Sequence, residues 1–277
     1  MAEAPILAGV IGSPIGHSKS PRLHGYWLQK HGINGHYIPM EVTAANLKTV
    51  LRHLPKAGFR GVNITLPHKE AALALADRIT DRAALIGAAN TLSFTADGAI
   101  QADNTDGYGF IENLHQYAPD WKPSATPALV LGAGGAARAV LSALLDAGVP
   151  RVTLANRTKG RAIDLAEAFG ARVDVIEWNS APSILETIGL LVNTTSLGMD
   201  GSAPLKFSIE NLPSTALVTD IVYSPLRTDL LKAAEAKGCT TVDGLGMLLH
   251  QAVPGFHRWF GLRPEVTDEL RQAVLAP

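Results

Sequence analysis

The chain has 277 residues, 47% of them apolar and 18% charged, which is enough for two domains with buried cores. Lys and Arg number 24 against 25 Asp and Glu, and this balance excludes the basic surface of a nucleic-acid binder or of a protein held on anionic lipid. The single cysteine, Cys239, excludes an internal disulfide and a cysteine zinc cluster. With neither a signal-peptide pattern nor a membrane-spanning apolar run, we expect a soluble, cytoplasmic protein.

Short apolar segments alternate with helical segments along the chain, which predicts the α/β class, with parallel sheets covered by helices on both faces. In the first half we expect strands near residues 6–11, 35–40, 60–64 and 89–94. Helices should open at Pro21 behind a capping Ser20, after Thr43, and at Pro67. Asp97-Gly98 is typical of a hairpin turn.

Lys69 lies two residues after Pro67, in the first turn of one of these predicted helices. A helix N-terminus carries partial positive charge, so a cation there is disfavoured unless its pKa is depressed or a carboxylate lies nearby. The position suggests a chemical role. The alternative is an ordinary solvated lysine on a helix face.

The other polar residues of this half that follow strands or open helices are mostly neutral: Ser18, Ser20, Asn63, Thr65, Asn90 and Asp106. Hydroxyls and amides with one lysine and one aspartate suit a small polyhydroxylated ligand. Structural roles are open for several of them. Ser20 and Asp106 would then cap helices, and Asn63 and Asn90 would turn the chain.

In the second half, the strand expected at 128–131 is followed by Gly-Ala-Gly-Gly-Ala-Ala-Arg-Ala (132–139), which opens a helix ending near Gly148. Glycines at this position let the backbone approach a pyrophosphate, and the helix N-terminus attracts the anion. Ala137 replaces the third glycine of the usual fingerprint, which the fingerprint tolerates. The segment predicts a dinucleotide site, with a purely structural glycine turn as the alternative.

The next strand ends in Asn156-Arg157-Thr158 and lacks the acidic residue that would hold a free ribose 2′-hydroxyl. Arg157 is able to bind a 2′-phosphate through paired hydrogen bonds, so the sequence favours NADP over NAD. The alternative is a surface arginine. Helices expected at about 244–257 and 264–275 follow the last strand and return to the first domain. We therefore expect a substrate domain of 1–107 completed by 246–277, and an NADP domain of 108–245.

These segments together resemble the shikimate dehydrogenase family over nearly the whole chain. The matching motifs, in order, are His-Ser-Lys-Ser-Pro (17–21), Gly-Val-Asn-Ile-Thr-Leu-Pro-His-Lys (61–69), Gly-Ala-Ala-Asn-Thr (87–91), Asn-Thr-Asp-Gly (104–107), Gly-Ala-Gly-Gly-Ala (132–136), Asn-Arg-Thr (156–158) and Asp-Gly-Leu-Gly-Met-Leu-Leu-His-Gln-Ala (243–252). The resemblance implies reversible, NADPH-dependent reduction of 3-dehydroshikimate to shikimate. It also implies an N-terminal α/β substrate domain and a Rossmann-like, doubly wound parallel-sheet NADP domain, with a cleft between them.

The resemblance further implies roles for matched residues, with Lys69 as acid/base beside Asp106. The substrate would be surrounded by Ser18, Ser20, Asn63, Thr65, Asn90, Asp106, Tyr223 and Gln251. The cofactor would be approached by Asp81, Gly132, Ala133, Gly134, Gly135, Ala136, Asn156, Arg157, Thr158, Lys159, Gly160, Arg161, Thr194, Ser196, Ile221 and Gly244. No metal is expected, because no histidine pair has ligand spacing with a carboxylate shell.

Two alternatives share this fold. A quinate or dual quinate/shikimate dehydrogenase would keep both Lys69 and Asp106, and a non-catalytic NADP-binding regulator would have no need of them. The partners we expect are shikimate and 3-dehydroshikimate, with no nucleic acid or membrane, and the chain is expected to be a monomer or homodimer.

Overall fold

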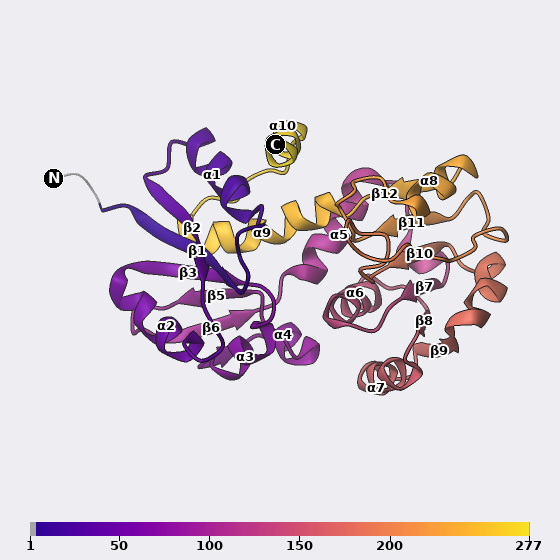
Figure 1. Cartoon of the computed structure of the whole chain (residues 1–277), viewed down its shortest axis with the longest axis horizontal. Coiled ribbons are helices and arrows are strands. Elements are labelled where there is room, and N and C mark those ends of the chain that lie inside the picture. The colour runs from indigo at the N-terminus through magenta and orange to yellow at the C-terminus, as the bar shows by residue number, and fades with distance from the viewer. Residues whose placement is uncertain (1–3, 277) are drawn as a thin grey trace. The chain divides into compact units, whose positions relative to one another are not determined.

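The computed structural model describes residues 4–276, and the chain divides into two compact units (Figure 1). Unit 1 contains Met1–Thr105 and Leu249–Pro277, and unit 2 contains Asp106–Leu248. Within the described residues, no helix is long and apolar enough to cross a membrane.

Unit 1 is built on a six-stranded sheet in the order β2-β1-β3-β5-β6-β4. The strands are β1 (Ile6–Gly12), β2 (Gly35–Glu41), β3 (Phe59–Ile64), β4 (Arg78–Ile79), β5 (Thr91–Phe94) and β6 (Ile100–Asp103). The pairs β1–β2, β1–β3 and β4–β6 are parallel, but β5 runs antiparallel to β3 and β6. The general expectation of parallel sheets is therefore wrong for β5. The hairpin predicted at Asp97-Gly98 is confirmed, since this turn connects β5 to the antiparallel β6, with Gly98 at φ 80°.

Helices cover both faces of this sheet. They are α1 (Ser20–Lys30), α2 (Leu47–His53), α3 (Lys69–Ala74), α4 (Asp81–Ile86), the unit 1 part of α9 (Leu245–Phe260) and α10 (Asp268–Leu275), with a 3-10 turn at η1 (Leu54–Ala57). On one face, Leu47 and Leu51 of α2 pack against Val62 and Leu92 of the sheet. Aromatic rings from α1, β2 and α9 pack together around the buried His24.

Two helix starts differ from the sequence prediction. Helix α1 begins at Ser20 itself, behind Lys19, and the cap position makes no side-chain hydrogen bond, so Ser20 is not the cap. Helix α3 begins at Lys69, and Pro67 lies in the turn before it. Lys69 is consequently the first helical residue, closer to the positive end of the helix dipole than predicted.

Unit 2 has a six-stranded, fully parallel sheet in the order β12-β11-β10-β7-β8-β9, which is the strand order of a Rossmann fold. Its strands are β7 (Ala128–Leu131), β8 (Val152–Asn156), β9 (Val173–Glu177), β10 (Leu190–Asn193), β11 (Leu217–Asp220) and β12 (Thr240–Val242). The expected doubly wound parallel sheet is confirmed. Strand order reverses between β7 and β10, where such folds bind ligands at the carboxyl ends of the strands.

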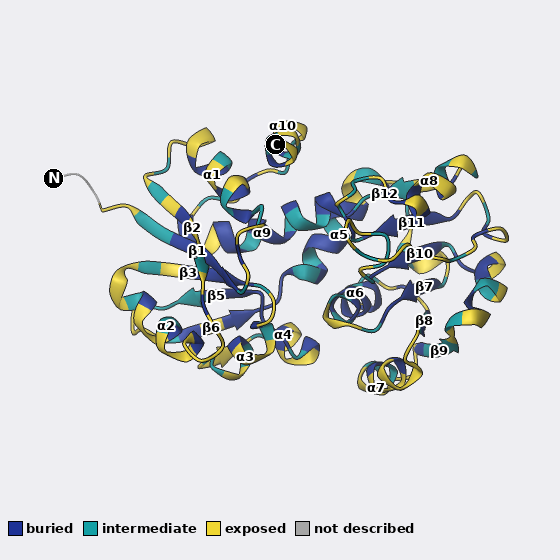
Figure 2. Cartoon of the chain, in the orientation of Figure 1, coloured by how far each residue is buried: buried dark blue, intermediate teal, exposed yellow. Residues whose placement is uncertain are grey.

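Side chains of β7 explain why both faces of this sheet are covered. Ala128 and Val130 point into one apolar core and Leu129 and Leu131 into the other, and all four are fully buried. Figure 2 shows the central strands of unit 2 in the dark blue of buried residues. The covering helices are α5 (Asp106–Tyr117), α6 (Gly135–Asp146), α7 (Lys159–Phe169), α8 (Asp229–Ala236) and the 3-10 segment η3 (Trp178–Thr187), with a short η2 (Pro123–Ala125) before β7.

Candidate active site

Tyr37 on β2 connects two of the expected substrate residues in unit 1. Its hydroxyl donates a 2.6 Å hydrogen bond to Oδ1 of Asn63, at the buried end of β3. The Ser20 side chain also hydrogen-bonds Tyr37, which lowers the pKa of that phenol, although burial is the larger effect and raises it well above its usual value. Because Ser20 does not cap α1, its hydroxyl is directed toward this group instead.

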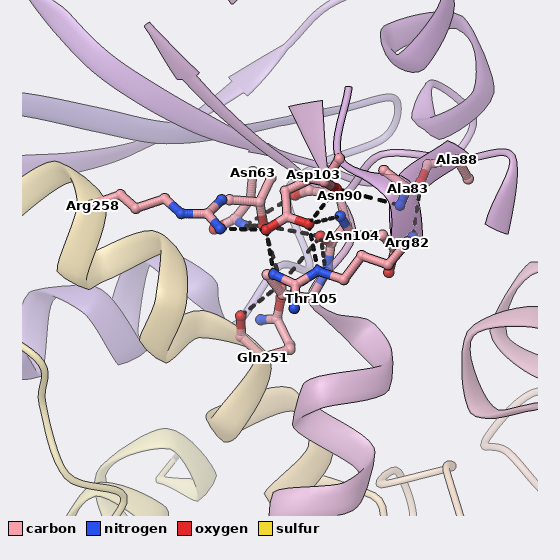
Figure 3. Close-up of polar contacts among 12 residues, drawn as sticks. Asn63, Arg82, Ala83, Ala88, Asn90, Asp103, Asn104, Thr105, Gln251 and Arg258 are labelled. Atoms are coloured by element: carbon pink, nitrogen blue, oxygen red, sulfur yellow. Dashed lines mark hydrogen bonds and ion pairs between the residues drawn. The ribbon is translucent and has the colours of Figure 1, made fainter. Parts of the chain in front are cut away.

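A buried amide and hydroxyl network continues from Asn63 to Asn90 and Gln251 (Figure 3). Nδ2 of Asn63 donates to the Asn90 carbonyl at 3.0 Å and to Thr91 Oγ1 at 3.2 Å. Oδ1 of Asn90 accepts from the Thr105 backbone N–H at 2.8 Å and from Thr91 Oγ1 at 2.9 Å. Nδ2 of Asn90 donates to Oε1 of Gln251 at 3.3 Å. These bonds fix which way each amide faces, so the network has a defined donor and acceptor pattern.

The main chain around Lys69 is tied to the same region. The Lys69 carbonyl accepts a 2.9 Å hydrogen bond from the Ala89 N–H, and the Asn104 side chain donates to the neighbouring Ala88 carbonyl at 3.0 Å. The preceding residue, His68, is buried, with Nε2 2.6 Å from the Val42 carbonyl oxygen. The start of α3 is thereby held on the loop that carries Asn90, and Lys69 itself is half-buried.

Ser18 and Thr65 are held by local contacts at the carboxyl edge of the unit 1 sheet. Oγ of Ser18 accepts from the Ser20 N–H at 3.3 Å, and the Thr65 N–H donates to the Ile11 carbonyl at 2.9 Å. A Cβ on Gly12 would lie 2.5 Å from Cγ2 of Thr65, so only glycine lets the two loops approach this closely. Unit 1 thus brings together Ser18, Ser20, Asn63, Thr65, Lys69, Asn90 and Gln251.

Asp106 and Tyr223 belong to unit 2, and Asp81 belongs to unit 1. Asp106 is the first residue of α5, directly after Thr105 in the chain. Tyr223 follows β11, where burial raises the pKa of its phenol. Asp81 is exposed at the start of α4, where a carboxylate interacts favourably with the helix dipole.

In unit 2, the predicted glycine turn lies at the carboxyl end of β7. Gly132 has φ 109°, and a Cβ there would be 2.6 Å from Thr194 Oγ1 at the end of β10. The Thr194 hydroxyl donates to the Leu131 carbonyl at 2.7 Å, so the two strand ends are joined at the reversal of strand order. By contrast, a Cβ on Gly134 or Gly135 would meet nothing within 4 Å. The protein's own packing does not require these two glycines, but a closely bound pyrophosphate at the start of α6 would.

At the carboxyl end of β8, residues 157–161 are all exposed. The Asn156 side chain donates to the Thr158 carbonyl at 2.8 Å and shapes the turn. Lys159 pairs with Glu177 at 2.7 Å. Arg157 and Arg161 form no ion pair with any residue in the described range, and no acidic side chain occupies the strand end itself. A 2′-phosphate therefore fits this turn better than a free hydroxyl.

The loop after β11 is organised by the fully buried Asp220. Its carboxylate accepts from the Asn193 side chain at 3.0 Å, the Val222 N–H at 3.0 Å and the Thr228 hydroxyl at 2.8 Å. Burial raises the pKa of Asp220 against these hydrogen bonds. A Cβ on Gly244 would lie 2.2 Å from the Ile221 carbonyl oxygen, which makes glycine necessary beside Ile221.

Sequence reasoning missed several residues that orient the site, namely Tyr37, Thr91, Asp103, Thr105 and Asp220. Asp103 adjoins one of the family motifs, and Thr91 and Thr105 each lie inside one. Their position within or next to these motifs was therefore the sequence signal that could have found them. Tyr37 gave no sequence signal beyond a local strand pattern, because its partner Asn63 lies 26 residues further along the chain, on another strand. Within residues 4–276, no group of three or more metal-ligating side chains is placed to hold a metal ion.

Family models match three segments of the chain. They describe a shikimate dehydrogenase substrate binding domain over residues 10–92, a shikimate / quinate 5-dehydrogenase over residues 116–199, and a shikimate 5′-dehydrogenase C-terminal domain over residues 244–275.

Similar proteins match from end to end. A Roseobacter denitrificans protein named shikimate dehydrogenase (NADP(+)) is 64% identical over 275 residues, covering 99% of each chain. The solved quinate dehydrogenase of Corynebacterium glutamicum, in complex with NAD, has TM-score 0.91 at 34% identity and covers 99% of each chain. The solved shikimate 5-dehydrogenase of Thermus thermophilus, in complex with NADP(H) and shikimate, has TM-score 0.86 at 38% identity and covers 97% of this chain and 98% of that one.

Proposed function

This chain belongs to the shikimate dehydrogenase family, and on that premise we propose that it catalyses the reversible, NADPH-dependent reduction of 3-dehydroshikimate to shikimate. The observation that carries the proposal is the buried amide and hydroxyl network of unit 1, from Ser20 through Asn63 and Asn90 to Gln251. It is rich in oriented neutral donors and acceptors and adjoins Lys69, which suits a small polyhydroxylated ring.

Lys69 is the acid/base in this proposal. When bound, NADPH supplies a hydride to the ring ketone. The Lys69 ammonium stabilises the developing alkoxide oxygen and gives it a proton, and in the reverse direction the amine removes that proton. Its support is the half-buried position at the start of α3, on a main chain fixed by Ala89. Asp106 hydrogen-bonds a substrate hydroxyl in this proposal.

The remaining substrate residues divide by chemistry. Ser18 and Ser20 take the carboxylate of the substrate, and the ring hydroxyls go to Asn63, Thr65, Asn90, Asp106, Tyr223 and Gln251. The substrate domain of this proposal is 1–107 with 246–277.

The chain's cofactor is NADP, bound within 108–245 with a contribution from Asp81. The open space at Gly134 and Gly135 supports a bound pyrophosphate, and Arg157 with Thr158 and Arg161 supports a 2′-phosphate. Further contacts come from Gly132, Ala133, Ala136, Asn156, Lys159, Gly160, Thr194, Ser196, Ile221 and Gly244.

We also infer a cytoplasmic location, which the single cysteine supports, and a monomer or homodimer as the solution state. Size-exclusion chromatography with light scattering measures the latter.

One assay tests the activity and its closest alternative. Purified protein is mixed with NADP or NAD and with shikimate or quinate, and reduced cofactor is followed by absorbance. The proposal expects the highest kcat/KM with NADP and shikimate. Preferred turnover of quinate with NAD would instead favour the activity for which the C. glutamicum protein is named.

A further inference from the structure

Asp103, at the end of β6, is fully buried and binds two arginines from different helices (Figure 3). Arg82 of α4 approaches both carboxylate oxygens, with Nε 2.6 Å from Oδ1. Arg258 of α9 binds Oδ2. Thr80 and the Asn104 N–H each donate to Oδ1 at 2.8 Å. Burial alone would raise the pKa of Asp103, but the guanidiniums outweigh burial and hold that pKa well below its usual range.

Arg258 follows Gln251 by seven residues on α9, which is two helical turns, so the two side chains lie on one face of the helix. Along that face they are about 10 Å apart. Gln251 meets the Asn90 side chain, and Arg258 meets the Asp103 carboxylate. Asn90 and Asp103 are themselves joined, since the Asn90 N–H donates to the Asp103 carbonyl at 3.1 Å. Helix α9 and the β6 region are thus attached through both side chains, and the Thr105 hydroxyl adds a hydrogen bond to the Gln251 carbonyl at 2.8 Å.

We propose that Arg258 is a positioning residue for substrate binding: its pairing with Asp103 sets the position of α9 along and around its axis, and this places the Gln251 amide. The inference rests on the proposed function only in taking Gln251 as a substrate contact. Two further hydrogen bonds hold α9, from Thr105 Oγ1 to the Gln251 carbonyl at 2.8 Å and from Trp259 Nε1 to the Leu92 carbonyl at 3.1 Å. Loss of the Arg258 pair therefore permits a small displacement of α9, which changes the geometry of the 3.3 Å contact between Gln251 and Asn90.

Arg82 provides a matched control. It binds the same carboxylate, and its side chain is 42% exposed against 32% for Arg258. Removing either arginine leaves Asp103 with one cation, so both variants should retain a paired buried carboxylate. Only Arg258 is carried by the helix that carries Gln251. A purely structural role of the ion cluster would therefore give similar kinetic effects for Arg82→Met and Arg258→Met.

The test compares these variants by steady-state kinetics of shikimate oxidation at saturating NADP. Arg258→Met should raise the KM for shikimate up to roughly tenfold, the effect of losing about one hydrogen bond to the substrate. The change in kcat should be about twofold or less, and the Kd for NADP without substrate should be unchanged. Arg82→Met should raise the KM by less than about twofold. In a Gln251→Ala background, Arg258→Met should have no further effect on KM, because the positioned group is already gone.

Equal KM increases for the two Met variants, or an undiminished effect of Arg258→Met without Gln251, would overturn the inference. If Arg258→Met does not fold, Arg258→Lys replaces it, and its KM should again exceed that of Arg82→Lys, because an ammonium cannot reproduce the guanidinium geometry. Failure of the proposed function has a different signature, namely wild-type protein that does not turn over shikimate. In that case amide hydrogen exchange of residues 249–256 is compared between the Arg258 and Arg82 variants. Faster exchange in the Arg258 variant alone would support the role of Arg258, and equal exchange in the two variants would refute it.

Discussion

The Tyr37 hydroxyl donates a 2.6 Å hydrogen bond to Oδ1 of Asn63, and both hydrogens of the Asn63 amide are used by Asn90 and Thr91. The phenol therefore holds the amide oxygen of Asn63 in the orientation that Asn90 and Thr91 set through the amide nitrogen. A buried residue of β2, outside every family motif, in this way supports the orientation of Asn63.

Replacing Tyr37 with Phe should destabilise the protein by about 1–3 kcal/mol, the cost of leaving a buried acceptor unsatisfied. It should also raise the KM for shikimate, because Asn63 loses one of the three hydrogen bonds that hold its amide. Urea unfolding and steady-state kinetics measure the two effects. Tyr26→Phe is the control, since Tyr26 is only half-buried and its change should stay within about 0.5 kcal/mol. Equal results for the two variants would contradict the role of Tyr37.

His24 should make stability fall with acid. Burial lowers the pKa of His24 to about 3, with the Asn63 side chain offsetting part of the effect. In the unfolded chain His24 binds a proton as the pH falls below about 6.5, whereas in the folded chain it stays neutral down to about pH 3. The contribution of neutral His24 to the free energy of unfolding is therefore lost as the pH falls from about 6.5 toward 3. Between pH 7 and pH 5 the loss is about 2 kcal/mol. In urea unfolding between pH 7 and pH 5, the free energy of unfolding of His24→Phe should fall by about 2 kcal/mol less than that of the wild-type protein. An unchanged pH dependence in the variant would refute the assignment.

The glycines of the β7–α6 turn should separate folding from cofactor binding. Gly134→Ala should leave the free energy of unfolding within about 0.5 kcal/mol, because its Cβ meets nothing, yet weaken NADP at least roughly tenfold. Gly132→Ala should destabilise folding by about 1–3 kcal/mol, because of φ 109° and contact with Thr194. Calorimetric titration with NADP and urea unfolding distinguish the two. Normal NADP affinity in Gly134→Ala would contradict the binding of the pyrophosphate at this turn.

Arg157 should select the cofactor. Arg157→Ala should raise the KM for NADPH by one to two orders of magnitude, on the order of 1.5–3 kcal/mol for charge-assisted hydrogen bonds. Kinetics with NADH, which has no 2′-phosphate, should barely change and serve as the internal control. Equal losses with both cofactors would mean that Arg157 supports the fold of the turn instead.

Lys69→Ala should lower kcat by about 10²- to 10⁴-fold, the range for a lost acid/base group, with a smaller change in KM. Lys69→Arg should not restore turnover, since a guanidinium keeps its proton at ordinary pH. Pre-steady-state and steady-state rates with 3-dehydroshikimate measure both. Near-normal turnover in the Ala variant would assign the proton transfer to another group.

The sequence by itself determined the α/β class, the glycine turn after β7 and the arginine at the end of β8, because each depends on local periodicity or on residues adjacent in the chain. Motif content was enough to identify the family. Only the tertiary structure decided that β5 pairs antiparallel with β3, that Ser20 meets Tyr37 instead of capping α1, and that Asp103 pairs with Arg82 and Arg258. Arg258 lies 155 residues from Asp103. A buried carboxylate is costly unless cations and hydrogen-bond donors surround it, and here the fold supplies them from distant parts of the chain. Local sequence patterns therefore do not predict such pairs.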